Sequence, residues 1–162
     1  MPRREVEKRL SVEWMAKHYP DGGYWLNYPL ITAELTKAYG QQAFVWARRA
    51  DALAVTKNEL HLIEFKVWKP SDGLDKLPTY ASLIPHIAEL SLYRSYPVKM
   101  ILVTPRPNPA LEESCRLNNI TLIEVHNAWI DEVVAGIEHL WTKEGRDAMA
   151  EKKRLRTWLG LD

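Results

Sequence analysis

Two apolar runs joined by a short polar connection most constrain the fold of this chain. Residues 43–56 (AFVWARRADALAVT) and 60–68 (LHLIEFKVW) are rich in strand-forming residues, and only three residues separate them. Because strands with so short a connection pair most simply in antiparallel fashion, we expect a β-hairpin. Three charged residues interrupt these apolar runs, namely Asp51, Glu64 and Lys66.

The length of the turn decides which residues face each other. If Lys57 and Asn58 form a two-residue turn, Asp51 lies directly opposite Glu64, whereas a three-residue turn shifts the pairing by one position. Directly opposed side chains have Cβ atoms about 4.5–5.5 Å apart, so two carboxylates placed there repel each other. Side-chain alternation puts Lys66 on the same face. We therefore expect a cation to balance the two carboxylates.

Two carboxylates beside a lysine suit the hydrolysis of a phosphate ester. Mg²⁺ is bound through one or two carboxylates, keeps several waters and takes substrate phosphate oxygens as further ligands. A neighbouring lysine can orient a water and stabilise negative charge on the phosphate. The alternative is a buried ion pair between Lys66 and a carboxylate that serves only the architecture, because such pairs also occur inside proteins.

The rest of the sequence predicts helices around a mixed sheet. Apolar runs predict further strands over 24–30, 98–104 and 120–125. Helical spacing and capping residues predict helices over 3–17, 31–40, 75–96, 110–118, 128–141 and 143–158. Gly40 is expected to end a helix, and Pro85 is expected to divide the helix over 75–96. The expected N-terminal caps are Asn108 and Asn127. The expected fold class is α/β, bordering on α+β, with a parallel βαβ unit over 98–125.

The length of 162 residues fits one domain, spanning 1–162, with a core over about 3–125 and a helical extension over about 127–160. No apolar run approaches the ~20 residues needed to cross a bilayer, and the N-terminal MPRREVEKRL lacks the apolar segment of a signal peptide. Cys115 is the only cysteine, so no disulfide can form within the chain. We expect a soluble, intracellular, cytoplasmic protein.

The hairpin and its charged residues resemble the PD-(D/E)xK nuclease superfamily, which has the restriction-endonuclease-like fold. The resemblance rests on Asp51, followed after the hairpin by Glu64-Phe65-Lys66, within about residues 43–104. Ala50 stands where the motif's name places proline. The resemblance implies an αβββαβ core, here with an extra C-terminal βα unit and a helical tail. It also implies a Mg²⁺ or Mn²⁺ site at Asp51, Glu64 and the Phe65 carbonyl oxygen, with Lys66 near the nucleophilic water.

Four other residues are candidates for accessory roles through the same resemblance. In many members of the superfamily a glutamate of the first helix approaches the metal, and Glu7 and Glu13 are the candidates here. Glu89 and Tyr93 look like the Gln-xxx-Tyr element of the RecB-like branch, with Glu in place of Gln. At i,i+4 spacing these two residues would share one helix face. For each of the four, a solvated surface position is the alternative.

Basic and aromatic residues suggest where a nucleic acid would bind. Candidate phosphate contacts are Arg48, Arg49, Lys69, Lys152, Lys153, Arg154 and Arg156. Ordinary surface salt bridges and a solvated helix end are the alternatives. The seven tryptophans are expected mainly in the core or at a dimer contact. The chain has no HExxH, GxGxxG or GxxxxGK[ST] pattern, which disfavours a zinc hydrolase and a nucleotide cofactor.

The sequence thus predicts a Mg²⁺-dependent DNA endonuclease that hydrolyses phosphodiester bonds through a metal-activated water. Asp51, Glu64 and Lys66 are the expected catalytic residues, and Mn²⁺ is expected to replace Mg²⁺. RNA is an alternative substrate, and a non-catalytic nucleic-acid-binding or assembly protein with the same fold is the alternative function. Cutting both strands with one site per chain is simplest in a twofold homodimer. No membrane partner is expected.

Overall fold

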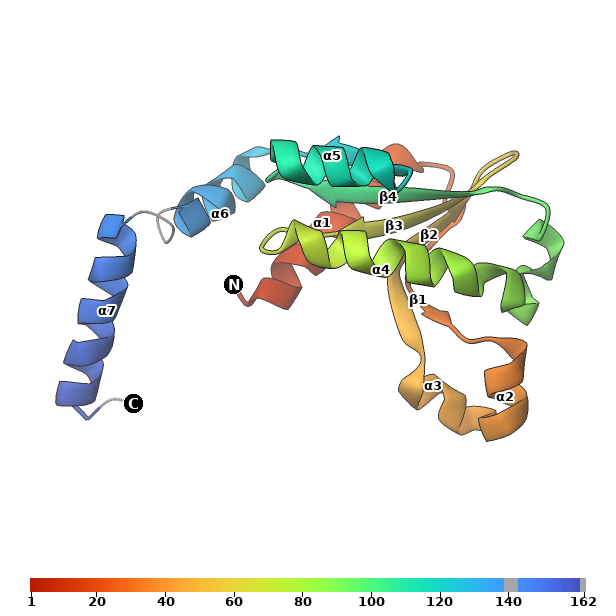
Figure 1. Cartoon of the computed structure of the whole chain (residues 1–162), viewed down its shortest axis with the longest axis horizontal. Helices are drawn as coiled ribbons and strands as arrows, with labels where there is room; N and C mark the ends of the chain where they lie inside the picture. Colours follow the sequence, from red (N-terminus) through yellow and green to blue (C-terminus); the bar gives the residue numbers. More distant parts are fainter. Residues whose placement is uncertain (139–142, 161–162) are drawn as a thin grey trace. The chain divides into compact units, whose positions relative to one another are not determined.

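The computed structural model describes residues 1–138 and 143–160, and the chain divides into two compact units, 1–125 and 126–162 (Figure 1). This boundary lies where the predicted core ends and the predicted helical extension begins. Every helix within the described residues is too short or too polar to traverse a bilayer.

A five-stranded mixed sheet forms the centre of the first unit. Its strands are β1 (Tyr24–Leu30), β2 (Arg48–Val55), β3 (Leu60–Phe65), β4 (Val98–Thr104) and β5 (Ile120–Glu124), and they lie side by side in chain order. The pairs β1–β2 and β2–β3 are antiparallel, whereas β3–β4 and β4–β5 are parallel. The predicted mixed sheet and the parallel βαβ unit are therefore confirmed.

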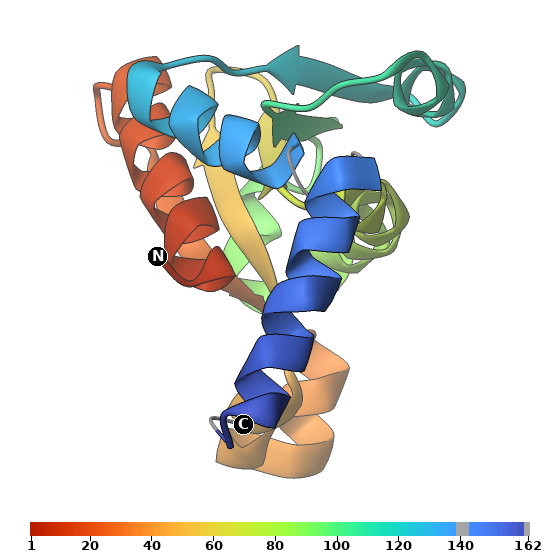
Figure 2. The ribbon, with the colours of Figure 1, turned by 90° about the vertical axis from the view of Figure 1, so that its left-hand side faces the viewer.

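Helices cover both faces of this sheet (Figure 2). They are α1 (Arg3–His18) on one face, and α4 (Pro70–Leu83) and α5 (Pro109–Leu117) on the other. The Trp14 ring of α1 meets Phe65 of β3 edge-on, with ring centroids 5.6 Å apart. On the opposite face Leu77 and Leu111 belong to one buried cluster with Leu62. Strand β3 is thus buried from both sides, as its continuous apolar character requires.

The β2–β3 hairpin has the register that a two-residue turn predicts. The Thr56 backbone N–H donates to the Glu59 carbonyl oxygen (2.9 Å), which closes the turn around Lys57 and Asn58. Val55 then pairs with Leu60, and this register continues to the pair formed by Ala52 and Ile63. The predicted register is therefore confirmed, and it brings Asp51 and Glu64 to facing positions at the end of the ladder.

A strand was predicted over 43–56, and the first part of this prediction is wrong, because residues 43–46 form a short helix. The segment between β1 and β2 consists of α2 (Ala33–Tyr39), η1 (Gly40–Gln42) and α3 (Ala43–Trp46). Only Ala43 of α3 is buried, so these residues lack the alternating burial that stabilises a strand. Gly40 ends α2 with a φ of 54°, as its position in the sequence predicts.

Two further boundaries differ from the prediction. The helix expected over 75–96 begins earlier, at Pro70, and continues through Pro78 to Leu83. Pro85 divides the remainder, as expected, into η2 (Ile84–His86) and η3 (Ala88–Tyr93), both of which are 3₁₀-helices. Strand β3 ends at Phe65, so the last three residues of the apolar run 60–68 lie beyond it.

The second unit contains α6 (Ala128–Glu138) and α7 (Lys143–Trp158). The Ile130 backbone N–H donates to Asn127 Oδ1 (2.9 Å), so the predicted helix cap is present. Residues 139–141 of the predicted helix lie outside the described residues. Both helices of the predicted C-terminal extension are otherwise confirmed.

Candidate functional site

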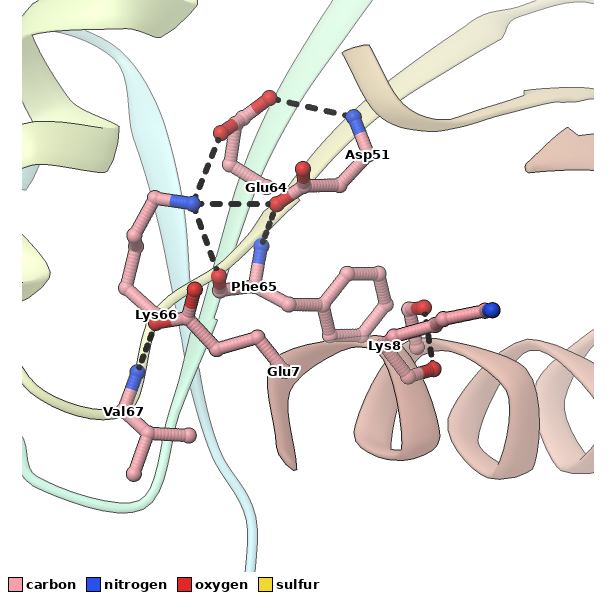
Figure 3. A network of polar contacts seen from close by, with 8 residues as sticks. Glu7, Lys8, Asp51, Glu64, Phe65, Lys66 and Val67 are labelled. Atoms are coloured by element: carbon pink, nitrogen blue, oxygen red, sulfur yellow. Dashed lines mark hydrogen bonds and ion pairs between the residues drawn. The ribbon is translucent and has the colours of Figure 1, made fainter. Parts of the chain in front are cut away.

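The Lys66 ammonium lies among three oxygens at the open end of the β2–β3 hairpin (Figure 3). Its Nζ is 3.2 Å from Asp51 Oδ2, 3.2 Å from Glu64 Oε2 and 3.0 Å from the Phe65 carbonyl oxygen. These are the three groups for which the superfamily resemblance implies metal ligation. The structure therefore brings Asp51, Glu64, Phe65 and Lys66 together at one point.

The two carboxylates are held by backbone groups that the strand ladder leaves free. The regular pairing of β2 and β3 stops at Ala52 and Ile63. Beyond that pair, the Asp51 N–H donates to Glu64 Oε1 (3.2 Å), and the Phe65 N–H donates to Asp51 Oδ2 (2.9 Å). Side chains thus replace the ladder bonds and fix the orientation of both carboxylates.

Glu64 is the most deeply buried member of this group. It is 0% exposed, whereas the Asp51 side chain is 34% exposed. Glu64 Oε2 lies at ion-pair distance from Lys66, but the geometry does not make a hydrogen bond, so this buried oxygen has no hydrogen-bond donor among the described residues. The pKa of Glu64 is raised to about 7, chiefly because the carboxyl is buried; the Asp51 charge also raises this pKa, and the Lys66 charge lowers it in part.

The Lys66 ammonium stays protonated at neutral pH. Burial lowers its pKa, but the charges of Asp51, Glu64 and Glu7 outweigh that effect and hold the pKa above the usual range for lysine. Lys66 therefore acts as a cation and a hydrogen-bond donor, and it cannot serve as a general base near pH 7.

Of the two candidate glutamates in α1, only Glu7 reaches this site. Its Oε1 accepts a hydrogen bond from the Val67 N–H (3.0 Å), directly after Lys66 in the chain. Glu13 forms an ion pair with Arg9 one turn away (2.7 Å) on the exposed side of the helix. The Lys8 side chain points away from the carboxylates in Figure 3.

Helix α4 contributes residues that the sequence reasoning missed. Gly73 allows close approach of the helix, because a Cβ there would lie 2.5 Å from Leu102 Cδ1 and 3.2 Å from Lys66 Cγ. One turn further, the charge of Lys76 lowers the pKa of Glu64. Burial and then the Glu64 charge raise the pKa of Tyr80. Pro70 at the first helical position is the sequence signal that would have placed Lys76 and Tyr80 on one helix face.

The expectation that Glu89 and Tyr93 share a helix face toward the site is wrong. Both residues belong to the 3₁₀-helix η3, in which residues three apart, rather than four apart, lie above each other. Glu89 accepts a hydrogen bond from the Tyr28 hydroxyl (3.4 Å), and Tyr93 packs against Tyr96 with ring centroids 5.5 Å apart. Instead, Lys76 and Tyr80 of α4 interact electrostatically with Glu64.

The predicted basic residues differ in their relation to the site. The charge of Arg48 acts on Tyr80 together with Glu64, Asp51 and Lys66, whereas Arg49 donates to the Asn27 carbonyl oxygen (3.2 Å). Lys69 is exposed next to the start of α4. In the second unit, Lys153, Arg154 and Arg156 are exposed on α7, and the side chain of Lys152 lies outside the described residues.

A cavity of about 350 Å³ adjoins Asp51. It is bounded by the first turns of α1, including Glu7 and Lys8, and by Leu26 and Asn27 of β1. Asn27 stands opposite Asp51 in the β1–β2 register and has a left-handed backbone with a φ of 52°. Such a conformation in the middle of a strand is unfavourable for a non-glycine residue, and residues of this kind cluster at functional sites.

The residues fit a single hard divalent cation. The described residues contain no group of three or more His, Cys, Asp and Glu side chains placed to hold a metal. Mg²⁺, however, needs only one or two carboxylates when waters and phosphate oxygens complete its ligands. Glu64 Oε2, a buried oxygen without a hydrogen-bond donor, is the atom that such a cation would satisfy.

Comparisons with protein-family models, with curated proteins and with solved structures found no match.

Proposed function

We propose that the chain is a metal-dependent nuclease of the PD-(D/E)xK type, acting on DNA or RNA phosphodiesters. One observation supports this above all others. The Lys66 ammonium contacts Asp51, Glu64 and the Phe65 carbonyl oxygen, so a positive charge already occupies the point where three oxygens converge. Apart from α2, η1 and α3 between β1 and β2, and η2 and η3 after α4, the element order from α1 to β4 is compatible with the αβββαβ core of that superfamily.

In this proposal Asp51, Glu64 and the Phe65 carbonyl oxygen hold Mg²⁺ or Mn²⁺. When bound, the cation lowers the pKa of a water and polarises a phosphoryl oxygen. The Lys66 ammonium, which lies beside the same three oxygens, would donate to the attacking water or to a phosphate oxygen. An ammonium group suits this role, because a protonated amine stabilises negative charge on the phosphate.

The surrounding residues orient and shield this chemistry. Glu7 fixes the chain after Lys66 through the Val67 N–H, which limits the positions that the ammonium can reach. Arg48, whose charge lowers the pKa of Tyr80 on α4, is the candidate to bind a neighbouring phosphate. Asp51 is partly exposed, so substrate and solvent approach from its side, next to the cavity between α1 and β1.

The decisive experiment is cleavage of a labelled panel of duplex, single-stranded, flap, four-way-junction and RNA substrates, with Mg²⁺, Mn²⁺ or EDTA. We expect metal-dependent cutting, and we expect Glu64→Ala and Lys66→Ala each to lower the rate by about 10²–10³-fold or more. Glu59→Ala, which removes a carboxylate at the turn end of the same hairpin, should leave the rate unchanged.

Two results would contradict the nuclease. One is the absence of cutting on every substrate although the protein binds Mn²⁺. The other is metal-dependent cutting that survives both Glu64→Ala and Lys66→Ala, because the activity then comes from elsewhere. Binding of nucleic acid without cutting would support a non-catalytic binding protein instead. A mass measurement in solution tests the predicted homodimer separately.

A further inference from the structure

The segment α2–α3, residues 33–46, exposes aromatic side chains that the fold does not use. It extends from the sheet between β1 and β2 (Figures 1 and 2). Phe44 and Trp46 are each 56% exposed, Tyr39 is 50% exposed and Val45 is 79% exposed. No residue of α2 or η1 is buried, and only Ala43 of α3 is. These side chains therefore do not stabilise a core, although monomeric proteins rarely expose apolar groups so close together.

The exposed rings have fixed orientations and remain accessible at the surface. Tyr39 and Trp46 pack edge to face, with ring centroids 4.9 Å apart, which fixes the orientation of both rings. A hollow of about 420 Å³ lies beside Phe44, and its lining is mainly apolar, including Pro29, Ile31 and Ile87. Flat rings held in place beside an apolar hollow are suited to a flat, uncharged partner group.

The charges next to these rings are complementary to a phosphate backbone. Residues 33–49 contain three basic residues and one acidic residue, which gives a net charge of +2. Two of the basic residues, Arg48 and Arg49, are exposed immediately after Trp46. Lys37 and Glu89 both line the hollow beside Phe44, so the formal charges of its lining cancel, which suits an uncharged base there. Exposed aromatic rings with flanking arginines are what proteins use to hold single-stranded nucleic acid.

The same segment leads directly into the candidate active site. Arg48 precedes Asp51 by three residues, a distance of about 10 Å along an extended strand. A strand of nucleic acid held on α2–α3 would therefore continue past Arg48 to the carboxylates. A second copy of this chain is the other partner that exposed rings suit, but the adjacent arginines and the site favour nucleic acid.

We propose that α2–α3 binds the unpaired bases of a nucleic-acid strand whose phosphodiester lies at Asp51 and Glu64. The location of that phosphodiester rests on the proposed nuclease function, whereas the base-stacking surface does not. The inference assigns the substrate a single-stranded portion, as in a flap, a splayed end or a single strand.

The test is binding of a labelled single strand and of the matching blunt duplex by the full chain in EDTA, which prevents metal-dependent cleavage. Trp46→Ala should weaken single-strand binding by about 5- to 150-fold, the range for loss of one stacked base, and duplex binding by much less. Trp46→Phe keeps a ring and should retain most of the affinity. Trp25→Ala, which removes a tryptophan that is 43% exposed on β1, is the matched control and should have little effect.

Several outcomes would overturn the inference. The first is an unchanged affinity of Trp46→Ala for the single strand. The second is an equal loss of affinity for the single strand and the duplex in this variant. The third is a Trp46→Ala variant that no longer dimerises but binds the single strand as tightly as wild type. If thermal unfolding shows that Trp46→Ala is not folded, Phe44→Ala must give the same strand-selective loss. Cleavage by wild type with Mg²⁺ separates the two proposals. If binding depends on Trp46 but no substrate is cleaved, only the nuclease proposal is refuted. If the substrate is cleaved but binding does not depend on Trp46, only the stacking surface is refuted.

Discussion

Both ends of the β2–β3 hairpin have hydrogen-bonded polar side chains, but within the described residues only the open end has a buried side-chain oxygen without a hydrogen-bond donor. At the turn end, Tyr19 Oη and His61 Nδ1 are 2.6 Å apart, and His61 Nε2 is 3.0 Å from Glu59 Oε2. The Glu59 N–H donates to Thr56 Oγ1 (3.1 Å), so polar groups there bond to one another. At the open end, Glu64 is fully buried, yet one of its oxygens lacks a donor.

Under the proposed function, this difference separates polar groups that serve the architecture from polar groups that bind a ligand. A buried oxygen without a hydrogen bond costs about 1–3 kcal/mol, and charged groups cost more. The turn end avoids this cost because each partner is supplied by the chain. The open end retains the cost, which is expected where a bound cation and phosphate complete the charge balance.

The largest predicted effect is stabilisation of the open end by metal. A ligand that binds only the folded state at a thousand times its Kd adds about 4 kcal/mol to the free energy of unfolding. Mn²⁺ or Mg²⁺ at saturating concentration should therefore raise the Tm of wild type by roughly 8–16 °C for a chain of this size. Glu64→Ala should lose this gain and Glu59→Ala should keep it. An equal gain in Glu64→Ala would place the metal elsewhere.

The second effect is a pH dependence of stability in the absence of metal. Because the pKa of Glu64 rises from 4.5 to about 7 on folding, the folded state holds a proton between these pH values that the unfolded state has lost. This group's contribution to stability is therefore present below pH 4.5 and is lost as the pH rises to about 7. The loss is at most about 3 kcal/mol.

The measurement is urea unfolding in EDTA across this pH range, with the difference between wild type and Glu64→Ala taken at each pH. Subtraction removes the contribution of the other carboxylates, whose stabilities change in their own ways with pH. The stability of wild type relative to Glu64→Ala should decrease as the pH rises. A relative stability that increases with pH would mean that Glu64 is charged and well paired in the folded protein.

The hairpin and its charged residues could be predicted because their signals are local. A two-residue turn sets the register, side-chain alternation sets the faces, and together they placed Asp51 opposite Glu64. Helix α3 was missed because Phe44, Val45 and Trp46 have high strand propensity, and propensity cannot show that a residue is exposed.

The contribution of α4 depended on packing over long sequence distances, which one sequence does not display. Lys76 and Tyr80 interact electrostatically with Glu64, and Gly73 on the same helix lets α4 approach β3 and β4 closely. The prediction began this helix at residue 75, and it named Glu89 and Tyr93 as site candidates because they look like the Gln-xxx-Tyr element of the RecB-like branch. The absence of a side chain at Gly73 therefore allows the close packing of α4, which the sequence alone does not show.

Gly73→Ala tests this close approach and should have an intermediate effect. The added Cβ would meet Leu102 Cδ1 at 2.5 Å and Lys66 Cγ at 3.2 Å, so the helix or the lysine must shift. Overpacking of this kind costs about 1–3 kcal/mol, partly offset by the better helix propensity of alanine. Thermal unfolding measures the change. Leu102→Val removes the nearest methyl, so the double variant should lose less than the sum of the single losses.

Tyr19→Phe should have the smallest effect of these changes. It also tests most directly whether the two ends of the hairpin have separate roles. The substitution removes the hydrogen bond to His61 and should lower the free energy of unfolding by about 1 kcal/mol. Tyr24→Phe is the matched control, because the described residues show no hydrogen bond to that hydroxyl. Both variants should keep wild-type cleavage and the wild-type Tm gain with Mn²⁺. A purely architectural hydrogen bond does not change the binding of a ligand at the opposite end of the strands. A loss of cleavage or of the Tm gain in Tyr19→Phe would therefore mean that the turn end also serves the site.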